Sequence, residues 1–277
     1  TAAYSFKLSP QLALGMNGTF IYSNLTGGIG GLNGQGQAGI AGAADVSFSW
    51  YNQDLDVGDM DGKVGVGFVV SNIGNKISYT DAGNADFLPT NLRLATSFEL
   101  GLDEYNKLTF ALDLNKLLVP TPPVYGQDPT VQNGPNVLIS GKDPNVGIME
   151  GMIQSFYDAP GIPVLDDDGD FVKSSDGTFE VEKGSVAKEE LREINVAFGM
   201  EYWYQDYFAL RMGLFYEHPT KGARQYMSTG FGLQYKSIGF DFSYLIAFRA
   251  NHPLANTIRF GLYYKFKPKS KSVEDDI

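Results

Sequence analysis

The chain has 277 residues, a net charge of -11, 43% hydrophobic residues and no cysteine. The acidic balance argues against a nucleic-acid partner, because no basic surface is available to neutralise phosphates. No apolar run reaches the roughly 18 residues of a membrane-spanning helix, so transmembrane helices are excluded. Transmembrane strands are not excluded, because a membrane strand need be apolar on one face only.

Apolar residues alternate with polar or small residues in one segment after another along the chain. Successive side chains of a strand point to opposite faces, so each such segment has one apolar and one hydrated face. About eleven segments show the pattern, each near the ~10 residues that cross a bilayer as a strand. They are residues 2–8, 12–22, 40–51, 63–71, 92–100, 108–114, 194–202, 208–216, 227–235, 238–248 and 256–266. The repetition predicts an all-β fold, a transmembrane antiparallel up-and-down β-barrel.

Short and long connections alternate between these segments. Short turns follow Ser9, Leu102, Tyr204 and Lys236, and the moderately long turn 52–61 belongs with them. The longer, polar connections are 24–37, 72–89, 117–189, 218–225 and 249–255. Outer-membrane barrels place short turns in the periplasm and long loops outside the cell. We therefore predict a single barrel domain, 1–277, in the outer membrane of a Gram-negative bacterium, with 117–189 extracellular and the tail 267–277 periplasmic.

The odd number of segments conflicts with barrel closure. Single-chain bacterial barrels have an even number of strands, and an open edge would leave unpaired backbone groups in hydrocarbon. The first segment must run toward the periplasm, so we expect an odd number of strands to precede Thr1.

The last segment also has the form of a barrel-assembly signal. It reads polar-x-Gly-x-x-hydrophobic-x-aromatic, carried by Arg259, Gly261, Tyr264 and Phe266. An aromatic anchor at the membrane interface would suit a terminal strand. Any aromatic-rich barrel strand could match this loose pattern, but the final position in the chain favours the signal.

Three segments carry a family resemblance. Residues 71–79 (SNIGNKISY), 87–94 (FLPTNLRL) and 5–9 (SFKLS) resemble the PorV/PorQ branch of the FadL-like outer-membrane barrels. The resemblance spans most of the chain except 120–188. It implies a fourteen-stranded barrel with an N-terminal plug region, and hence three strands before Thr1.

The resemblance also implies a function. Such proteins are non-enzymatic components of the type IX secretion system that bind its outer-membrane translocon barrel (SprA/Sov-like). They receive cargo carrying a C-terminal secretion domain and pass it to a cell-surface attachment complex that contains a sortase-like peptidase. The lipid bilayer is the remaining partner, and no cofactor is implied.

The residues themselves agree with a protein that is not an enzyme. There is no cysteine nucleophile and no set of spaced metal ligands. The two histidines, His218 and His252, both precede proline in predicted loops. We interpret each as a loop-capping residue and not as a catalytic base.

An acidic run at Asp166, Asp168 and Asp170 suggests calcium. An EF-hand loop starting at Asp166 needs glycine at its sixth position and glutamate at its twelfth. Phe171 and Gly177 stand there, so the motif fails. A solvated acidic loop is the favoured interpretation, and a loose surface calcium site is the alternative.

The long connection 117–189 contains the candidate functional surface. If helical, its central stretch presents one apolar stripe, which Gly151 weakens and Pro160 ends. The stripe consists of Ile148, Met149, Met152, Ile153, Phe156 and Tyr157. It could pack over the barrel mouth as a rim helix, or dock the translocon or a cargo domain. It could also line a ligand groove, and the alternative function is then a FadL-like channel for hydrophobic small molecules.

The predicted inner face of the barrel carries charges of both signs. They predict a cross-linked, hydrated interior that stiffens the barrel, and a selective pore is the minority interpretation. The residues are Lys63, Arg93, Glu99, Asp113, Glu201, Arg211, Asp241, Arg249, Arg259 and Lys265.

Overall fold

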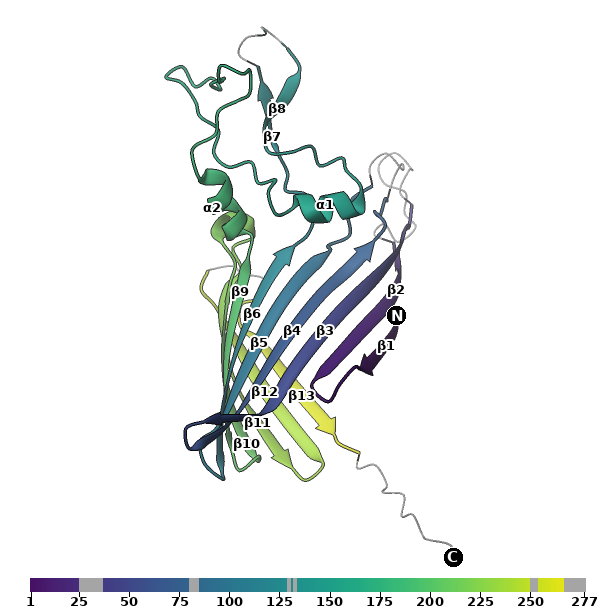
Figure 1. Ribbon diagram of the computed structural model, residues 1–277, viewed down its shortest axis with the longest axis vertical. Coiled ribbons are helices and arrows are strands. Elements are labelled where there is room, and N and C mark those ends of the chain that lie inside the picture. The colour runs from purple at the N-terminus through teal and green to yellow at the C-terminus, as the bar shows by residue number, and fades with distance from the viewer. Residues whose placement is uncertain (25–36, 80–84, 129–130, 132–133, 250–253, 267–277) are drawn as a thin grey trace, which may run out of the picture.

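The main element of the computed structural model is an 11-stranded antiparallel sheet, hereafter the wall (Figure 1). The structure describes residues 1–24, 37–79, 85–128, 131, 134–249 and 254–266. Every strand of the wall pairs with the next one in the chain, except that β6 pairs with β9. In order, the strands are β1 (Ala2–Lys7), β2 (Leu12–Ser23), β3 (Gly39–Val57), β4 (Met60–Gly74), β5 (Asn91–Gly101), β6 (Asn106–Leu117), β9 (Asn195–Tyr204), β10 (Phe208–Tyr216), β11 (Gln225–Tyr235), β12 (Ile238–Ala247) and β13 (Thr257–Tyr264).

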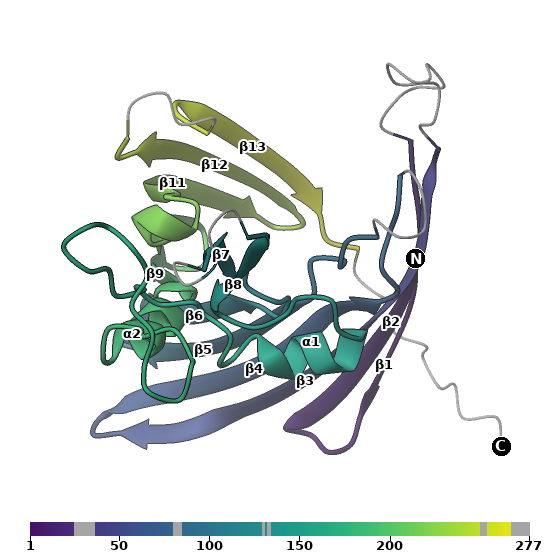
Figure 2. The same ribbon diagram turned by 90° about the horizontal axis from the view of Figure 1, so that it is seen from above.

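Seen from above, the wall curves around a central space like the side of a barrel (Figure 2). Its two edges are β1 and β13, and no pairing joins them within the described residues. The prediction of eleven antiparallel strands in up-and-down order is therefore confirmed. Closure into a fourteen-stranded barrel stays a prediction.

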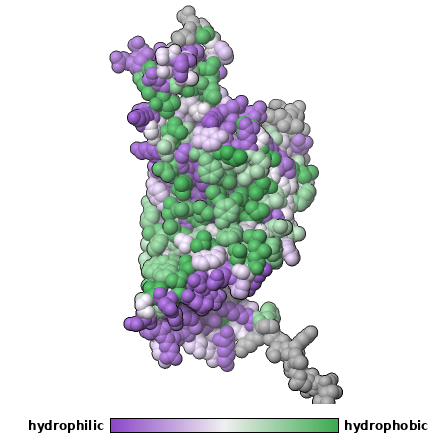
Figure 3. Space-filling view, viewed as in Figure 1, coloured by the Kyte–Doolittle hydropathy of each residue, from purple (hydrophilic) through white to green (hydrophobic). Residues whose placement is uncertain are grey.

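The convex face of the wall is apolar, as the alternation predicts. On β13, Ile258, Phe260 and Leu262 are 51%, 72% and 79% exposed. The strand register aligns such residues across the sheet, so that Phe260 lies opposite Phe242, which in turn lies opposite Phe231. Figure 3 shows this face as an apolar band between more hydrophilic ends. The band is the surface that a bilayer covers in a transmembrane barrel.

The concave face carries ion pairs that join different strands. Lys63 Nζ lies 2.7 Å from Glu99 Oε1, and the guanidinium of Arg211 contacts both Glu201 and Asp241. Arg211 and Asp241 reach each other across Gly232 of β11, where an added Cβ would lie 2.9 Å from atoms of both side chains. The predicted cross-linked interior is confirmed for these pairs.

Short and long connections lie at opposite ends of the wall, as predicted (Figure 1). One predicted turn is wrong. Most of residues 52–61 belong to strands, because β3 continues to Val57 and β4 begins at Met60. Only Gly58 and Asp59 connect the two strands. Gly58 has a φ of +66°, which glycine adopts without strain. The apolar alternation ends near the membrane boundary while the backbone pairing continues beyond it.

The connection between β6 and β9, residues 118–194, is hereafter called the cap. We predicted 117–189 as a loop, but the cap is folded. It contains a hairpin of β7 (Val124–Gln127) and β8 (Asn136–Ser140), the helices α1 (Ile148–Gln154) and α2 (Ser185–Arg192), and three isolated β-bridges among residues 163–181. No helix among the described residues is long and apolar enough to cross a membrane.

Candidate functional site

The predicted apolar stripe is divided by the end of α1. The helix stops at Gln154, with Ser155 as its C-cap, and Phe156 and Tyr157 lie in the turn that follows. The prediction of one continuous helical stripe is therefore wrong. On α1 itself, Met149 and Ile153 are 62% and 61% exposed. Ile148 and Met152, which belong to the same prediction, are half-buried.

The opposite side of α1 packs on the rim of the wall (Figures 1 and 2). Gly151 and Gln154 are buried there, and a Cβ added at Gly151 would lie 2.9 Å from the Phe87 ring and 3.2 Å from Pro120. The Gln154 amide donates a hydrogen bond of 3.0 Å to the Asp143 carbonyl. Gly151, which we expected to weaken the helix, instead permits this close contact. The rim-helix interpretation, in which the apolar stripe itself packs over the barrel mouth, does not hold for Met149 and Ile153, which are exposed.

Five charged residues attach α2 to the wall. Lys116, at the end of β6, is 6% exposed, and its Nζ lies 2.6 Å from Glu193 Oε2 and 3.1 Å from Glu190 Oε2. Lys221, in the short helix η2 (Pro219–Lys221), lies 2.7 Å from Glu189 and 2.9 Å from Glu193. The five side chains form one connected network, with Glu193 as its centre.

The same glutamates fix the chain that follows α1. Glu190 accepts a hydrogen bond of 2.9 Å from the backbone N–H of Ala159, and Glu189 accepts one of 2.8 Å from Gly161. Thr121 donates from its hydroxyl to Glu193 at 2.9 Å. Buried charges are tolerated when they are paired and fully hydrogen-bonded, as here. The network therefore holds α2, the chain that follows α1 and the end of β6 as one unit.

The network also shifts two pKa values. Burial opposes ionisation of Glu193, but the hydrogen bonds from Lys116 and Lys221 outweigh it and lower the pKa of the carboxyl group. Burial likewise lowers the pKa of Lys221, but the hydrogen bonds to Glu189 and Glu193 outweigh it and raise that pKa. Both groups are thus held in their charged forms.

Sequence reasoning missed this network. Its members are separated by up to about a hundred residues in the chain, so no local motif joins them. One signal was available at Lys116, which follows Leu112 and Leu114 on the apolar face of its strand. A lysine on the lipid-facing side of a strand requires an acidic partner. The cap supplies two such partners, Glu190 and Glu193.

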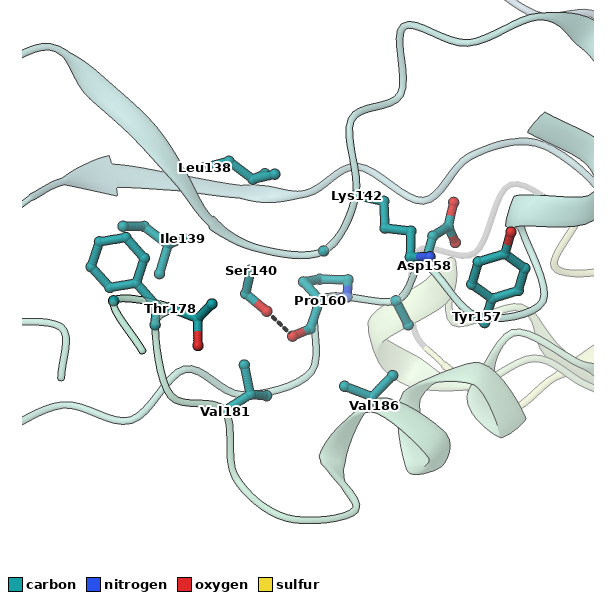
Figure 4. Close-up of a pocket in the computed structure, with 14 residues that line it drawn as sticks. Leu138, Ile139, Ser140, Lys142, Tyr157, Asp158, Pro160, Thr178, Val181 and Val186 are labelled. Atoms are coloured by element: carbon teal, nitrogen blue, oxygen red, sulfur yellow. Dashed lines mark hydrogen bonds between the residues drawn. The ribbon is translucent and has the colours of Figure 1, made fainter. Parts of the chain in front are cut away.

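The upper part of the cap forms an open pocket of about 500 Å³ (Figure 4). Its lining includes Ile139 of β8, Val186 of α2, and Val181, which precedes α2. The hydroxyl of Ser140 donates to the Pro160 carbonyl and ties β8 to the chain after α1. The pocket therefore lies between the β7–β8 hairpin, the chain after α1 and α2.

The remaining predicted site residues have local roles where the structure describes them. His218 caps η2, because its Nδ1 accepts a hydrogen bond from the Thr220 N–H. This confirms the loop-capping interpretation for His218, whereas His252 lies outside the described residues, as does the tail 267–277.

Asp166 supports a turn in the acidic run. Its Oδ1 accepts hydrogen bonds of 3.0 Å and 2.9 Å from the backbone N–H groups of Asp168 and Asp170. In the described part of the chain, no group of three or more histidine and acidic side chains is placed to hold a metal ion.

The proposed assembly signal lies at the edge strand of the wall. Arg259, Gly261 and Tyr264 belong to β13, and Phe266, 85% exposed, follows its end. Tyr264 and Phe266 contact each other edge to face, with ring centroids 4.9 Å apart. Recognition by an assembly machinery stays a prediction.

One known protein family is similar in sequence to the N-terminal part of the chain. Residues 1–124 match the family model described as type IX secretion system protein PorV. A search of curated proteins found no match. Among solved structures, the chain is similar to the KdgM porin in complex with disordered oligogalacturonate, with a TM-score of 0.39 and 8% sequence identity over 96% of this chain and 90% of that chain.

The matched residues cover β1 to β6 and the first residue of β7, which include all three segments that carry the resemblance seen in the sequence. A strand wall with an apolar outer face fits an outer-membrane protein. Over residues 1–124 the chain is therefore similar to the type IX secretion system protein PorV family.

Proposed function

We propose that this protein is a non-enzymatic adaptor of the type IX secretion system that docks its outer-membrane translocon barrel through the cap. In this proposal it also receives secreted cargo by the C-terminal secretion domain and passes it to a cell-surface attachment complex with a sortase-like peptidase. The cap faces the outside of the cell.

The observation that carries the proposal is the exposed side of α1. Met149 and Ile153, one turn apart, are both more than half exposed. Their helix is held by Gly151 against Phe87, and the chain that follows it is held by Glu189 and Glu190. Large apolar side chains on a rigid support are typical of protein-docking sites, because little conformational entropy is lost on binding.

The concave face of the wall weighs against the alternative, a channel for hydrophobic small molecules. Such a channel needs a continuous apolar path. The concave face instead carries ion pairs at several levels, among them Lys63 with Glu99 and Arg93 with Asp113. These charges favour a hydrated interior.

The test is co-purification of the translocon barrel from detergent-solubilised membranes. We expect Met149→Asp with Ile153→Asp to reduce the recovered translocon at least about tenfold, because about 1.4 kcal/mol of lost binding energy has that effect. Ile148 and Met152 are left unchanged because they are half-buried and their loss would disturb the fold.

The matched control is Leu165→Asp, which adds a charge at a cap residue that is 53% exposed but lies outside α1. It should retain the translocon. Retention of translocon and cargo by the double variant, in a folded wall, would overturn the assignment of this surface.

A further inference from the structure

A second apolar surface of the cap lies between the end of α1 and α2. It is a groove of about 690 Å³, and its apolar lining consists of Phe156, Tyr157, Val186, Ala187, Leu191 and Ile194. Leu191 is 69% exposed, and Phe156 and Tyr157 are about half exposed. So large an apolar surface needs an occupant other than water.

The groove is continuous with the lipid-facing band of the wall. Ile194 immediately precedes β9 and has the same parity as Phe198, which is 44% exposed on the convex face. Lys116 lies on the other side of the groove. In β6 it points to the same face as Leu112, which is 38% exposed on the convex side. The groove thus extends the membrane-covered surface upward from two adjacent strands, β6 and β9.

The charges around the groove also fit a membrane surface. Lys116 is neutralised by Glu190 and Glu193, and its Nζ lies 5.8 Å from the centre of the Phe156 ring. The glutamates of α2 are therefore engaged. Lys188 and Arg192, on the same helix, make no ion pair within the described residues. Anionic lipid headgroups attract unpaired basic residues that flank the apolar face of a helix.

We propose that α2 and the Phe156–Tyr157 turn lie in the interface of the bilayer, and that acyl chains of membrane lipids fill the groove. The surface is distinct from the Met149 and Ile153 side of α1 and does not depend on the proposed function. The lipid occupant sets the height and tilt at which the cap stands over the membrane.

Site-directed spin labelling tests the proposal cleanly, because the chain has no cysteine of its own. Leu191→Cys is labelled with a nitroxide, and the protein is folded into vesicles of phosphatidylethanolamine and phosphatidylglycerol at a low ratio of protein to lipid. Collisions with oxygen, which concentrates in the membrane, are compared with collisions with a water-soluble nickel complex. Phe198→Cys is the lipid-facing reference, and Leu165→Cys is the water-exposed reference on the cap.

We expect the ratio of oxygen to nickel accessibility at residue 191 to shift to the side of residue 198. A ratio like that of residue 165 would overturn the proposal, since the groove would then face water. Low accessibility to both reagents would also overturn it, since protein would then cover the groove. If Leu191→Cys does not fold, Ala187→Cys, one turn earlier and exposed, gives the same readout.

Discussion

The wall and the cap are stabilised in different ways. Each wall strand pairs with its neighbours over most of its length, and the convex side chains face lipid. In the cap, strand pairing is confined to the β7–β8 hairpin and isolated bridges, and a network of five charged side chains attaches α2. The stability of the wall is therefore spread over many equivalent contacts, whereas the attachment of the cap depends on a few groups.

The largest expected effect comes from removing the lysine at the base of the network. Lys116→Met leaves Glu190 and Glu193 without their shared partner, and breaking a buried ion pair costs about 3 kcal/mol or more. The backbone N–H groups of Ala159 and Gly161 report cap opening, because Glu190 and Glu189 hold them. We expect their hydrogen exchange to accelerate roughly 150-fold, with exchange in the wall strands unchanged.

The control for this change is Lys107→Met. Lys107 pairs with Asp206 at 2.8 Å, but the two side chains are 37% and 66% exposed. An exposed pair contributes less than about 1 kcal/mol. Equal effects of Lys107→Met and Lys116→Met on the cap amides would contradict the account of the network.

A smaller effect is expected from a charge on the wall, and it should depend on the face. Leu112 and Ala111 are adjacent in β6 and point to opposite faces. Leu112→Arg places a charge in lipid and should destabilise the folded wall by about 2 kcal/mol, whereas Ala111→Arg faces the hydrated side and should cost less than about 1 kcal/mol. Urea titration of folding in lipid vesicles measures both, and equal losses would show that the faces are assigned wrongly.

The smallest expected effect is a loosening of the cap in acid. The pKa of Glu193 is lower in the folded protein, so its contribution to stability is complete above the unfolded value of about 4.3. That contribution is lost as the pH falls through the lower folded pKa. The raised pKa of Lys221 acts only at the alkaline end, because its contribution is complete below about pH 10.

A spin label at Ile162→Cys, close to the network, can follow this change. Its mobility should increase as the pH falls below about 4.3. In Glu193→Gln the increase should be smaller, because the carboxyl group with the lowered pKa is absent. The same pH dependence with and without Glu193 would contradict its central place in the network.

The wall could be predicted from the sequence because each strand separates lipid from water. That environment imposes a period of two on every segment, and the strand count and the order of short and long connections followed from it. The prediction failed at 52–61, where the strands leave the membrane. The segment around Asp54 and Asp56 does not alternate between apolar and polar residues as the membrane strands do, yet β3 continues through it.

The cap could be predicted only in part. The apolar residues of α1 were recognised from their spacing, but Phe156 and Tyr157 were joined to a helix that ends before them. The partners of Lys116 come from α2 and the residue after it, more than 70 positions away. Such contacts are set by tertiary packing, which local periodicity does not encode.

We propose that the exposed side of α1 in the cap carries the function, while the wall supports it. Recovery of the translocon barrel with Met149→Asp/Ile153→Asp, compared in one experiment with Leu165→Asp and Ala111→Arg, tests this most directly. We expect loss of the translocon in the first variant alone. Recovery of the translocon with the first variant at the level of the other two would contradict it.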